Sequence, residues 1–287
     1  MKDTLLNDKK KRETVKLIKA KNYAKVISIL EKIKTNHAGT AKTKDKRFVI
    51  SEIVRDILEN SSEREKDFFI DGSFFIKRKE DVAKEIGVSL IWRGYKVNPK
   101  KVKEYLLKTA DDGNWEVREY AGSAFAATVF HFPEFYKSLL KYAKSHSENV
   151  RRAVVIAATG LRYKENLSKA FSLFEVLLFD ESKYVRKNLG PFILGSYFGN
   201  KYPAETLKQI KKWSKIRDEN LRWNLIMAFN NSFGNKYPEE ALEVLKLFTG
   251  DVDLTVKRAM NSTLNFLEKR HKKIVSEFRK KYNPETY

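Results

Sequence analysis

Apolar residues recur along most of the chain with the 3.6-residue period of amphipathic helices. In the first third this period predicts basic helices within residues 1–35, then helices at 48–58 and 80–92. Between the first two lies a polar segment of small residues, Asn36–Lys46, which predicts a loop or linker. Further on, phenylalanines flank Asp71-Gly72, which predicts apolar packing beside a turn.

From Asn98 onward the same period predicts consecutive helical pairs. Asn98 and Pro99 have the character of a helix cap and a first helical residue. The predicted pairs cover residues 99–129, 133–160, 168–197, 203–231 and 238–268.

A short pattern marks the start of the second helix in every pair: an aliphatic residue followed by a cation. It recurs at steps of 33, 35, 36 and 35 residues, as Val117-Arg118, Val150-Arg151, Val185-Arg186, Leu221-Arg222 and Val256-Lys257. A fixed period in the mid-thirties is typical of helical-pair repeats, which bury their apolar faces only by stacking on neighbours. The sequence therefore predicts an all-α protein, a right-handed superhelical solenoid of antiparallel helical pairs.

A repeated hexapeptide supports this period. Phe-Gly-Asn-Lys-Tyr-Pro occurs at Phe198–Pro203 and again at Phe233–Pro238. We interpret it as a turn between helices, in which Gly ends one helix in the left-handed conformation and Pro begins the next. Aspartates six residues before the cation are expected to cap the second helices; they are Asp112, Asp180 and Asp251.

Composition narrows the classes of function. The 287 residues are 42% hydrophobic, which suffices for a core, and they include no cysteine and only four histidines. We therefore expect no disulfide, no thiol catalysis and no metal site built from cysteine or histidine. The net charge of +21 favours a polyanionic partner. Residues 1–50 hold 15 cations against 5 anions, and residues 269–287 hold 7 against 2.

The chain has no signal-peptide pattern and no stretch of roughly 20 apolar residues that could span a membrane. We therefore expect a cytoplasmic protein without membrane contact, and separately we expect it to be a monomer. We divide it into a basic helical cap at 1–97, continuous with the solenoid, five pairs at 98–268 and a basic tail at 269–287, frayed after Asn283-Pro284.

The repeated pattern resembles HEAT repeats, which commonly carry Asp and, six residues later, Arg at the head of the second helix. The resemblance implies that these residues bond along the stack as a ladder. Two copies depart from it, with Ser145 and Ile216 at the Asp position.

The residue after each cation varies in a more informative way. Because stacked pairs bring equivalent positions to one face, these residues are expected to form a stripe, with about 10 Å between repeats. The stripe suits an anionic polymer with aromatic parts and comprises Glu119, Arg152, Lys187, Trp223 and Arg258.

Trp115 and Glu119 stand four residues apart and share a helix face. The run NWEVREYAG, followed by ENVRRAVVIA, resembles the HEAT-like-repeat DNA glycosylases of alkylation repair. That resemblance implies excision of N3- or N7-alkylated purines from duplex DNA, without metal or organic cofactor. It also implies that Glu119 stabilises the oxocarbenium-like sugar and that Trp115 packs on the cationic nucleotide.

The same resemblance assigns a backbone phosphate to Arg152 or Arg151. The stripe itself, not the resemblance, makes Lys187, Trp223 and Arg258 candidates for further DNA contacts. Two departures are visible: Glu stands where the family more often has Asp, and the aromatic wall expected in the third repeat is absent. Phe192 or Trp223 is a candidate substitute.

Plainer interpretations of these residues stay open at this point. Trp115 can be a packing residue, and Glu119 can form a surface ion pair worth under about 1 kcal/mol. Two other classes of function remain: a non-catalytic protein that binds damaged or structured nucleic acid, and a protein-interaction scaffold.

Overall fold

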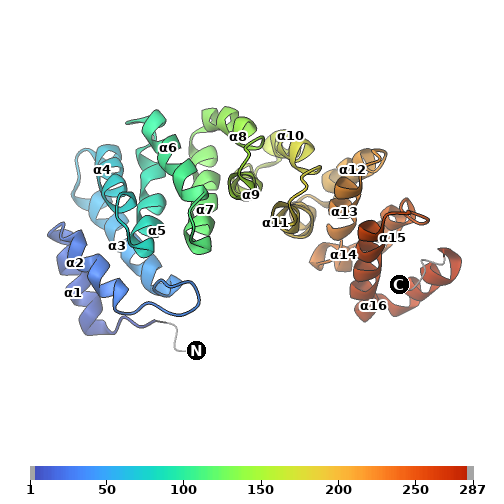
Figure 1. Ribbon diagram of the computed structural model, residues 1–287, viewed down its shortest axis with the longest axis horizontal. Coiled ribbons are helices and arrows are strands. Elements are labelled where there is room, and N and C mark those ends of the chain that lie inside the picture. Colours follow the sequence, from blue (N-terminus) through green and yellow to red (C-terminus); the bar gives the residue numbers. More distant parts are fainter. Residues whose placement is uncertain (1–3, 283–287) are drawn as a thin grey trace. The chain divides into compact units, whose positions relative to one another are not determined.

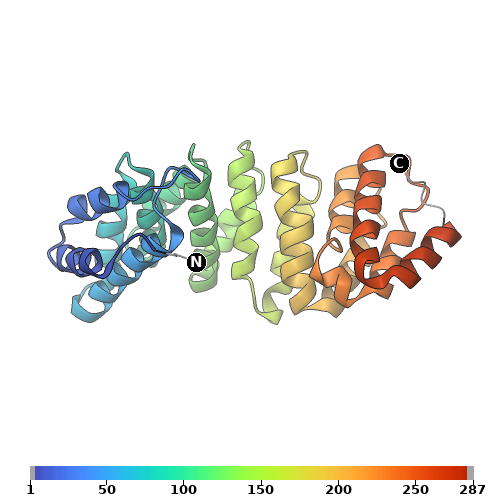
Figure 2. The ribbon, with the colours of Figure 1, turned by 90° about the horizontal axis from the view of Figure 1, so that it is seen from below.

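The computed structural model describes residues 4–282 and is built from helices (Figures 1 and 2). Within these residues there is no β-strand, and one isolated bridge joins Lys34 to Ala41. The predicted all-α class of successive helical pairs is confirmed. No helix in the described range is long and apolar enough to cross a membrane.

The chain forms two compact units, residues 1–136 and 137–287. The cap, repeat and tail boundaries placed at residues 97 and 268 stay predictions. The first unit contains α1 (Asp8–Lys19), α2 (Tyr23–Glu31), α3 (Thr43–Asn60), α4 (Arg64–Ile76), α5 (Asp81–Ile91), η1 (Trp92–Gly94), α6 (Pro99–Ala110), α7 (Trp115–His131) and η2 (Pro133–Phe135).

The N-terminal helices share a core with α3, α4 and α5. The apolar stripe predicted within residues 1–35 is buried there, with Val26 and Leu30 fully covered. Burial of that stripe against three other helices stabilises α1 and α2, which are too short to be stable alone.

The predicted turn at Asp71-Gly72 is wrong, because both residues lie inside α4. Gly72 serves a close approach between helices: a β-carbon there would lie 2.9 Å from the Ile91 backbone. Gly87 of α5 in turn lets α5 approach Ile76 of α4 just as closely. Glycine occurs at these positions because the two helices pack too closely for a side chain, not because the backbone turns there.

The segment predicted as a linker, Asn36–Lys46, is shorter than expected. Helix α3 already begins at Thr43, and the remaining loop is tied to the rest of the first unit by hydrogen bonds. Asp45 and Lys46 are both buried, and the Asp45 carboxylate accepts hydrogen bonds from the Leu5 and Leu6 amides.

The second unit holds the later pairs (Figure 1). Its elements are α8 (Tyr136–Tyr142, whose first residue closes the first unit), α9 (Glu148–Ala157), η3 (Ala158–Gly160), η4 (Lys164–Asn166), α10 (Leu167–Leu177), α11 (Lys183–Asn188), the π-helix η5 (Leu189–Gly199), α12 (Pro203–Trp213), α13 (Glu219–Met227), α14 (Ser232–Lys236), α15 (Pro238–Lys246) and α16 (Leu254–Tyr282). The second helices stack in order, α9 on α11, α11 on α13, and α13 on α16.

Helix α16 continues through the segment predicted as a tail, after a kink at His271. Val275 and Phe278 are buried beyond the kink. The predicted fraying after Asn283-Pro284 lies outside the described residues.

The repeated hexapeptide keeps only half of its predicted role. Pro203 and Pro238 stand at the first turn of α12 and α15, as expected. The glycines, however, are helical, and a left-handed glycine occurs in the described range only at Gly39 and Gly250. A β-carbon on Gly199 would lie 2.5 Å from the ring of Phe233, and one on Gly234 would lie 2.0 Å from the Phe229 carbonyl oxygen. Gly199 therefore permits tight stacking on the next repeat, and Gly234 lets α14 approach the turn after α13 closely.

Candidate functional site

Helix α7 carries the Trp and Glu singled out by the sequence. Asn114 caps it by accepting a hydrogen bond from the Glu116 amide, which makes Trp115 the first helical residue. The Trp115 side chain is 39% exposed, and Glu119, one turn further, is half-buried. The structure therefore places both residues on one helix, with the indole reaching solvent.

The neighbouring carboxylate, Glu116, has a structural role. It accepts a hydrogen bond of 2.9 Å from the Thr40 hydroxyl and lies 2.8 Å from the Lys46 ammonium. Glu116 therefore ties α7 to the loop before α3 and to the buried lysine.

Lys46 is the centre of a buried polar cluster that the sequence did not reveal. Its side chain is fully buried, as is that of Glu85 on α5, and the two groups are 2.8 Å apart. The Lys46 ammonium also contacts the Thr40 hydroxyl and lies over the Tyr120 ring. Burial raises the pKa of Glu85 from 4.5 to about 7, while the neighbouring Lys46 opposes that rise.

One signal for this cluster was present in the sequence. Glu85 follows Val82 by three residues and precedes Ile86, so it falls on the apolar stripe of its predicted helix. A carboxylate on such a stripe needs a buried partner. Nothing local identified Lys46 as that partner, since it lies in a different helix.

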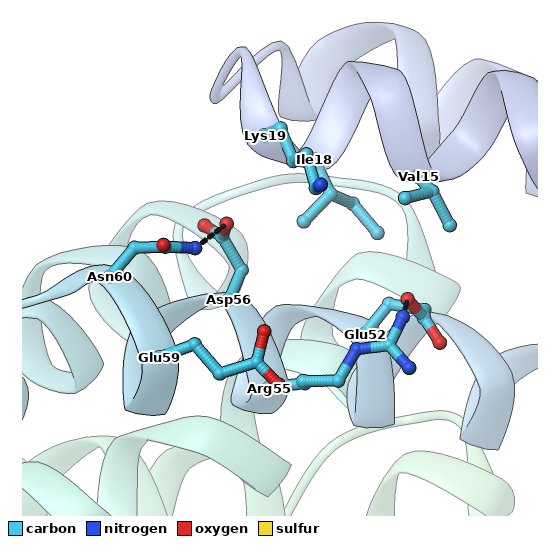
Figure 3. Close-up of a pocket in the computed structure, with 8 residues that line it drawn as sticks. All are labelled: Val15, Ile18, Lys19, Glu52, Arg55, Asp56, Glu59 and Asn60. Atoms are coloured by element: carbon cyan, nitrogen blue, oxygen red, sulfur yellow. Dashed lines mark hydrogen bonds and ion pairs between the residues drawn. The ribbon is translucent and has the colours of Figure 1, made fainter.

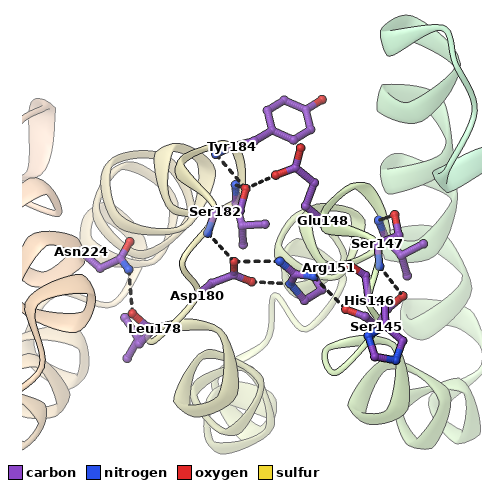
Figure 4. A network of polar contacts seen from close by, with 12 residues as sticks. Ser145, His146, Ser147, Glu148, Arg151, Leu178, Asp180, Ser182, Tyr184 and Asn224 are labelled. Atoms are coloured by element: carbon purple, nitrogen blue, oxygen red, sulfur yellow. Dashed lines mark hydrogen bonds and ion pairs between the residues drawn. The ribbon is translucent and has the colours of Figure 1, made fainter.

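The ladder predicted from the HEAT resemblance is present in the second unit, and Figure 4 shows its Arg151–Asp180 contact. Arg151 forms a bidentate ion pair with Asp180, with Nε–Oδ2 at 2.6 Å and Nη2–Oδ1 at 3.0 Å. Arg222 lies 3.1 Å from Asp251. These pairs confirm the structural role expected of the two arginines.

The ladder aspartates do not cap helices, so that prediction is wrong. Asp112, Asp180 and Asp251 each accept a hydrogen bond from the amide two residues later. Each stands two residues before the residue that caps the helix, and its carboxylate receives that residue's amide instead of a helical one. The caps of the second helices are Asn114, Ser147, Ser182, Asp218 and Asp253.

Where the ladder lacks its aspartate, the arginine finds other partners. Ile216 occupies the Asp position, and Arg186 is buried beneath the next helix. Its guanidinium donates to the Asn220 side chain and lies 5.4 Å from the Trp223 ring centroid. Burial lowers the pKa of Arg186.

The remaining stripe residues of the second unit differ in accessibility. Arg152 is only 6% exposed, and its guanidinium lies 4.6 Å from the Tyr184 ring centroid. Lys187 on α11 and Arg258 on α16 are exposed, and Trp223 is half-buried between them in chain order. Phe192, the candidate aromatic substitute, is 61% exposed on the π-helix.

Separate from these residues, a pocket of about 290 Å³ lies between α1 and α3 (Figure 3). Its polar side chains largely engage one another: Arg55 pairs with Glu52, and Asn60 donates to Asp56. None of the predicted site residues lines it. Among the described residues, no group of three or more His, Cys, Asp or Glu side chains could hold a metal ion.

No known family model matches the chain, and no curated protein matches it either. Similar solved structures include engineered proteins and designed armadillo repeat proteins. One engineered protein is 13% identical, with 77% of this chain and 98% of that chain covered and a TM-score of 0.30. A designed armadillo repeat protein is 17% identical, with 76% and 99% covered and a TM-score of 0.28. Likenesses this weak carry no argument about function.

Proposed function

We propose that this chain binds duplex DNA and hydrolyses the N-glycosidic bond of N3- or N7-alkylated purines. The observation that supports the proposal best is the exposed indole of Trp115 with the Glu119 carboxylate one turn further along α7. The two side chains share one helix face, so a nucleotide that stacks on the indole lies within reach of the carboxylate.

The reaction requires few catalytic groups from the protein. An N3- or N7-alkylated purine is cationic, so it leaves as a neutral base when its bond to C1′ breaks. Water adds its oxygen to C1′ and gives up a proton. A carboxylate at the position of Glu119 stabilises the positive sugar and accepts that proton, as in glycoside hydrolysis. The face of the Trp115 indole attracts the cationic base.

DNA binding draws on cations of the second unit. Lys187 and Arg258 are exposed on stacked second helices and are suited to phosphate contact. Arg151 is engaged by Asp180, and Arg152 is covered and lies against Tyr184. We therefore assign the phosphate contacts to Lys187 and Arg258, and a supporting role to the two adjacent arginines.

The test incubates the protein with duplex DNA that carries 7-methylguanine or 3-methyladenine and counts released bases and abasic sites. Wild type is expected to release bases, and Glu119→Gln to lose on the order of 100-fold in rate with DNA binding retained. Glu104→Gln, an exposed glutamate on α6, is the control and should match wild type.

Other results would point to the alternative classes. Salt-sensitive DNA binding without base release from any variant would overturn the proposed enzymatic activity. It would leave a nucleic-acid-binding repeat protein, a function that the exposed Lys187 and Arg258 suit equally well. Absence of both binding and release would overturn the whole proposal and favour a protein-interaction scaffold.

A further inference from the structure

The loop before α3 brings a second aromatic ring to Trp115. The ring centroids of His37 and Trp115 are 5.2 Å apart, and their planes meet at 82°. Both side chains are exposed. Phe229 and Phe233, by contrast, form a stacked pair that is fully buried in the core.

The loop is fixed on both sides of Trp115. The Asn114 amide group donates to the Ala38 carbonyl at 2.9 Å, and the Thr40 hydroxyl donates to Glu116 at the same distance. The residues before and after the tryptophan therefore hold the residues around His37.

Contacts within the loop and below it restrict its shape further. The Thr35 amide donates to the Thr40 carbonyl, and Gly39 adopts the left-handed conformation that closes the turn. Beneath it, the buried Lys46 binds the Thr40 hydroxyl. The His37 ring is thus presented by an anchored backbone, so little ordering is needed when a ligand binds.

Two exposed rings at right angles form a corner that suits a flat ligand. A heterocycle that stacks on one ring can meet the other ring or its N–H group at its edge, which is a favourable aromatic geometry. Glu119 shares the helix face of Trp115.

We propose that His37 and Trp115 together form the recess that holds one nucleobase, and that His37 is a ligand-contacting residue which favours an alkylated over an intact purine. This inference rests on the proposed function and adds to it the loop before α3 as part of the site. It assigns a role to a segment whose sequence alone predicts only a linker.

The experiment compares the affinity for a duplex containing one 7-methylguanine with the affinity for the same duplex containing guanine. The ratio is measured for wild type, His37→Ala, His37→Phe and Trp115→Ala. The control is His146→Ala, which changes the exposed histidine of the α8–α9 turn in the same way. Base release is recorded for every variant.

In His37→Ala the ratio of the two affinities is expected to fall roughly tenfold, as in Trp115→Ala. His37→Phe, which keeps a ring, should retain most of it, and His146→Ala should match wild type. The phenylalanine variant separates loss of the ring from loss of the fold.

A His37→Ala variant with the wild-type preference and wild-type release would overturn the role of His37 and leave the proposed function standing. A wild-type protein with neither preference nor release would overturn the proposed function, and the recess with it. Preference that depends on His37 without any release would support the recess and overturn only the catalytic step.

Discussion

The Lys46 ammonium lies 2.8 Å from the Glu85 carboxylate, and both side chains are completely buried. The same ammonium reaches Glu116 at 2.8 Å, so one lysine joins α3, α5 and α7. Buried charges are expensive unless paired, and this cluster pairs them directly behind the loop that carries His37.

Removal of the lysine should therefore be costly. Lys46→Met is expected to lower the free energy of unfolding by about 3–5 kcal/mol, because it leaves Glu85 buried without its counter-charge. Chemical denaturation at pH 8 measures the change. The double variant Lys46→Met with Glu85→Met should recover most of the loss. A double variant no more stable than the single one would contradict the assignment of the cost to an unpaired charge.

The raised pKa of Glu85 predicts a particular dependence of stability on pH. The carboxyl is protonated more readily in the folded protein, with a pKa of about 7 against 4.5. Between these values the folded state binds more protons than the unfolded state, so stability must fall as pH rises from about 4.5 to above 7. The loss attributable to this group is on the order of 3 kcal/mol.

Glu85→Gln is the variant that isolates this effect. Its free energy of unfolding, measured by denaturation across pH 4.5–8, should lack the fall that wild type shows. Parallel curves for the two proteins would show that another group is responsible.

The arginine ladder offers a contrast between covered and exposed ion pairs. Asp180→Asn is expected to lower the free energy of unfolding by about 1–3 kcal/mol, since the Asp180 side chain is 4% exposed and accepts two hydrogen bonds from Arg151. Glu243→Gln breaks an ion pair with Lys211 in which both partners are exposed, and it should cost under about 0.5 kcal/mol. Urea denaturation of both variants provides the comparison, and equal losses would argue against a structural ladder.

The helical pairs were largely predictable because their signals are local. Pro203 and Pro238 mark helix starts by their own geometry, and the aliphatic residue of each repeated pair is buried, as with Val117 and Val150. The roles of Gly72 and Gly199 were not predictable, since a glycine that admits a neighbouring helix has the same local sequence as one that ends a helix.

The candidate site was predictable only in part, for a related reason. The spacing of Trp115 and Glu119 is a property of one helix, so it could be recognised directly. The contact of Thr40 with Glu116 spans 76 residues, and the position of His37 depends on it. Periodicity reports which face of a helix is buried, but it does not report which distant segment covers that face.

The salt dependence of DNA binding tests the assigned phosphate contacts. Each phosphate neutralised by a cation steepens the fall of log K with log salt concentration by about 1. Lys187→Gln and Arg258→Gln should each flatten that slope by about 1 and weaken binding to all sequences alike. Lys212→Gln, an exposed cation on α12, the first helix of its pair, serves as control and should leave the slope unchanged. The measurement is fluorescence anisotropy of a labelled duplex between about 50 and 200 mM salt. If Lys187→Gln and Arg258→Gln kept the same slope as the Lys212→Gln control, the DNA would have to bind a different surface.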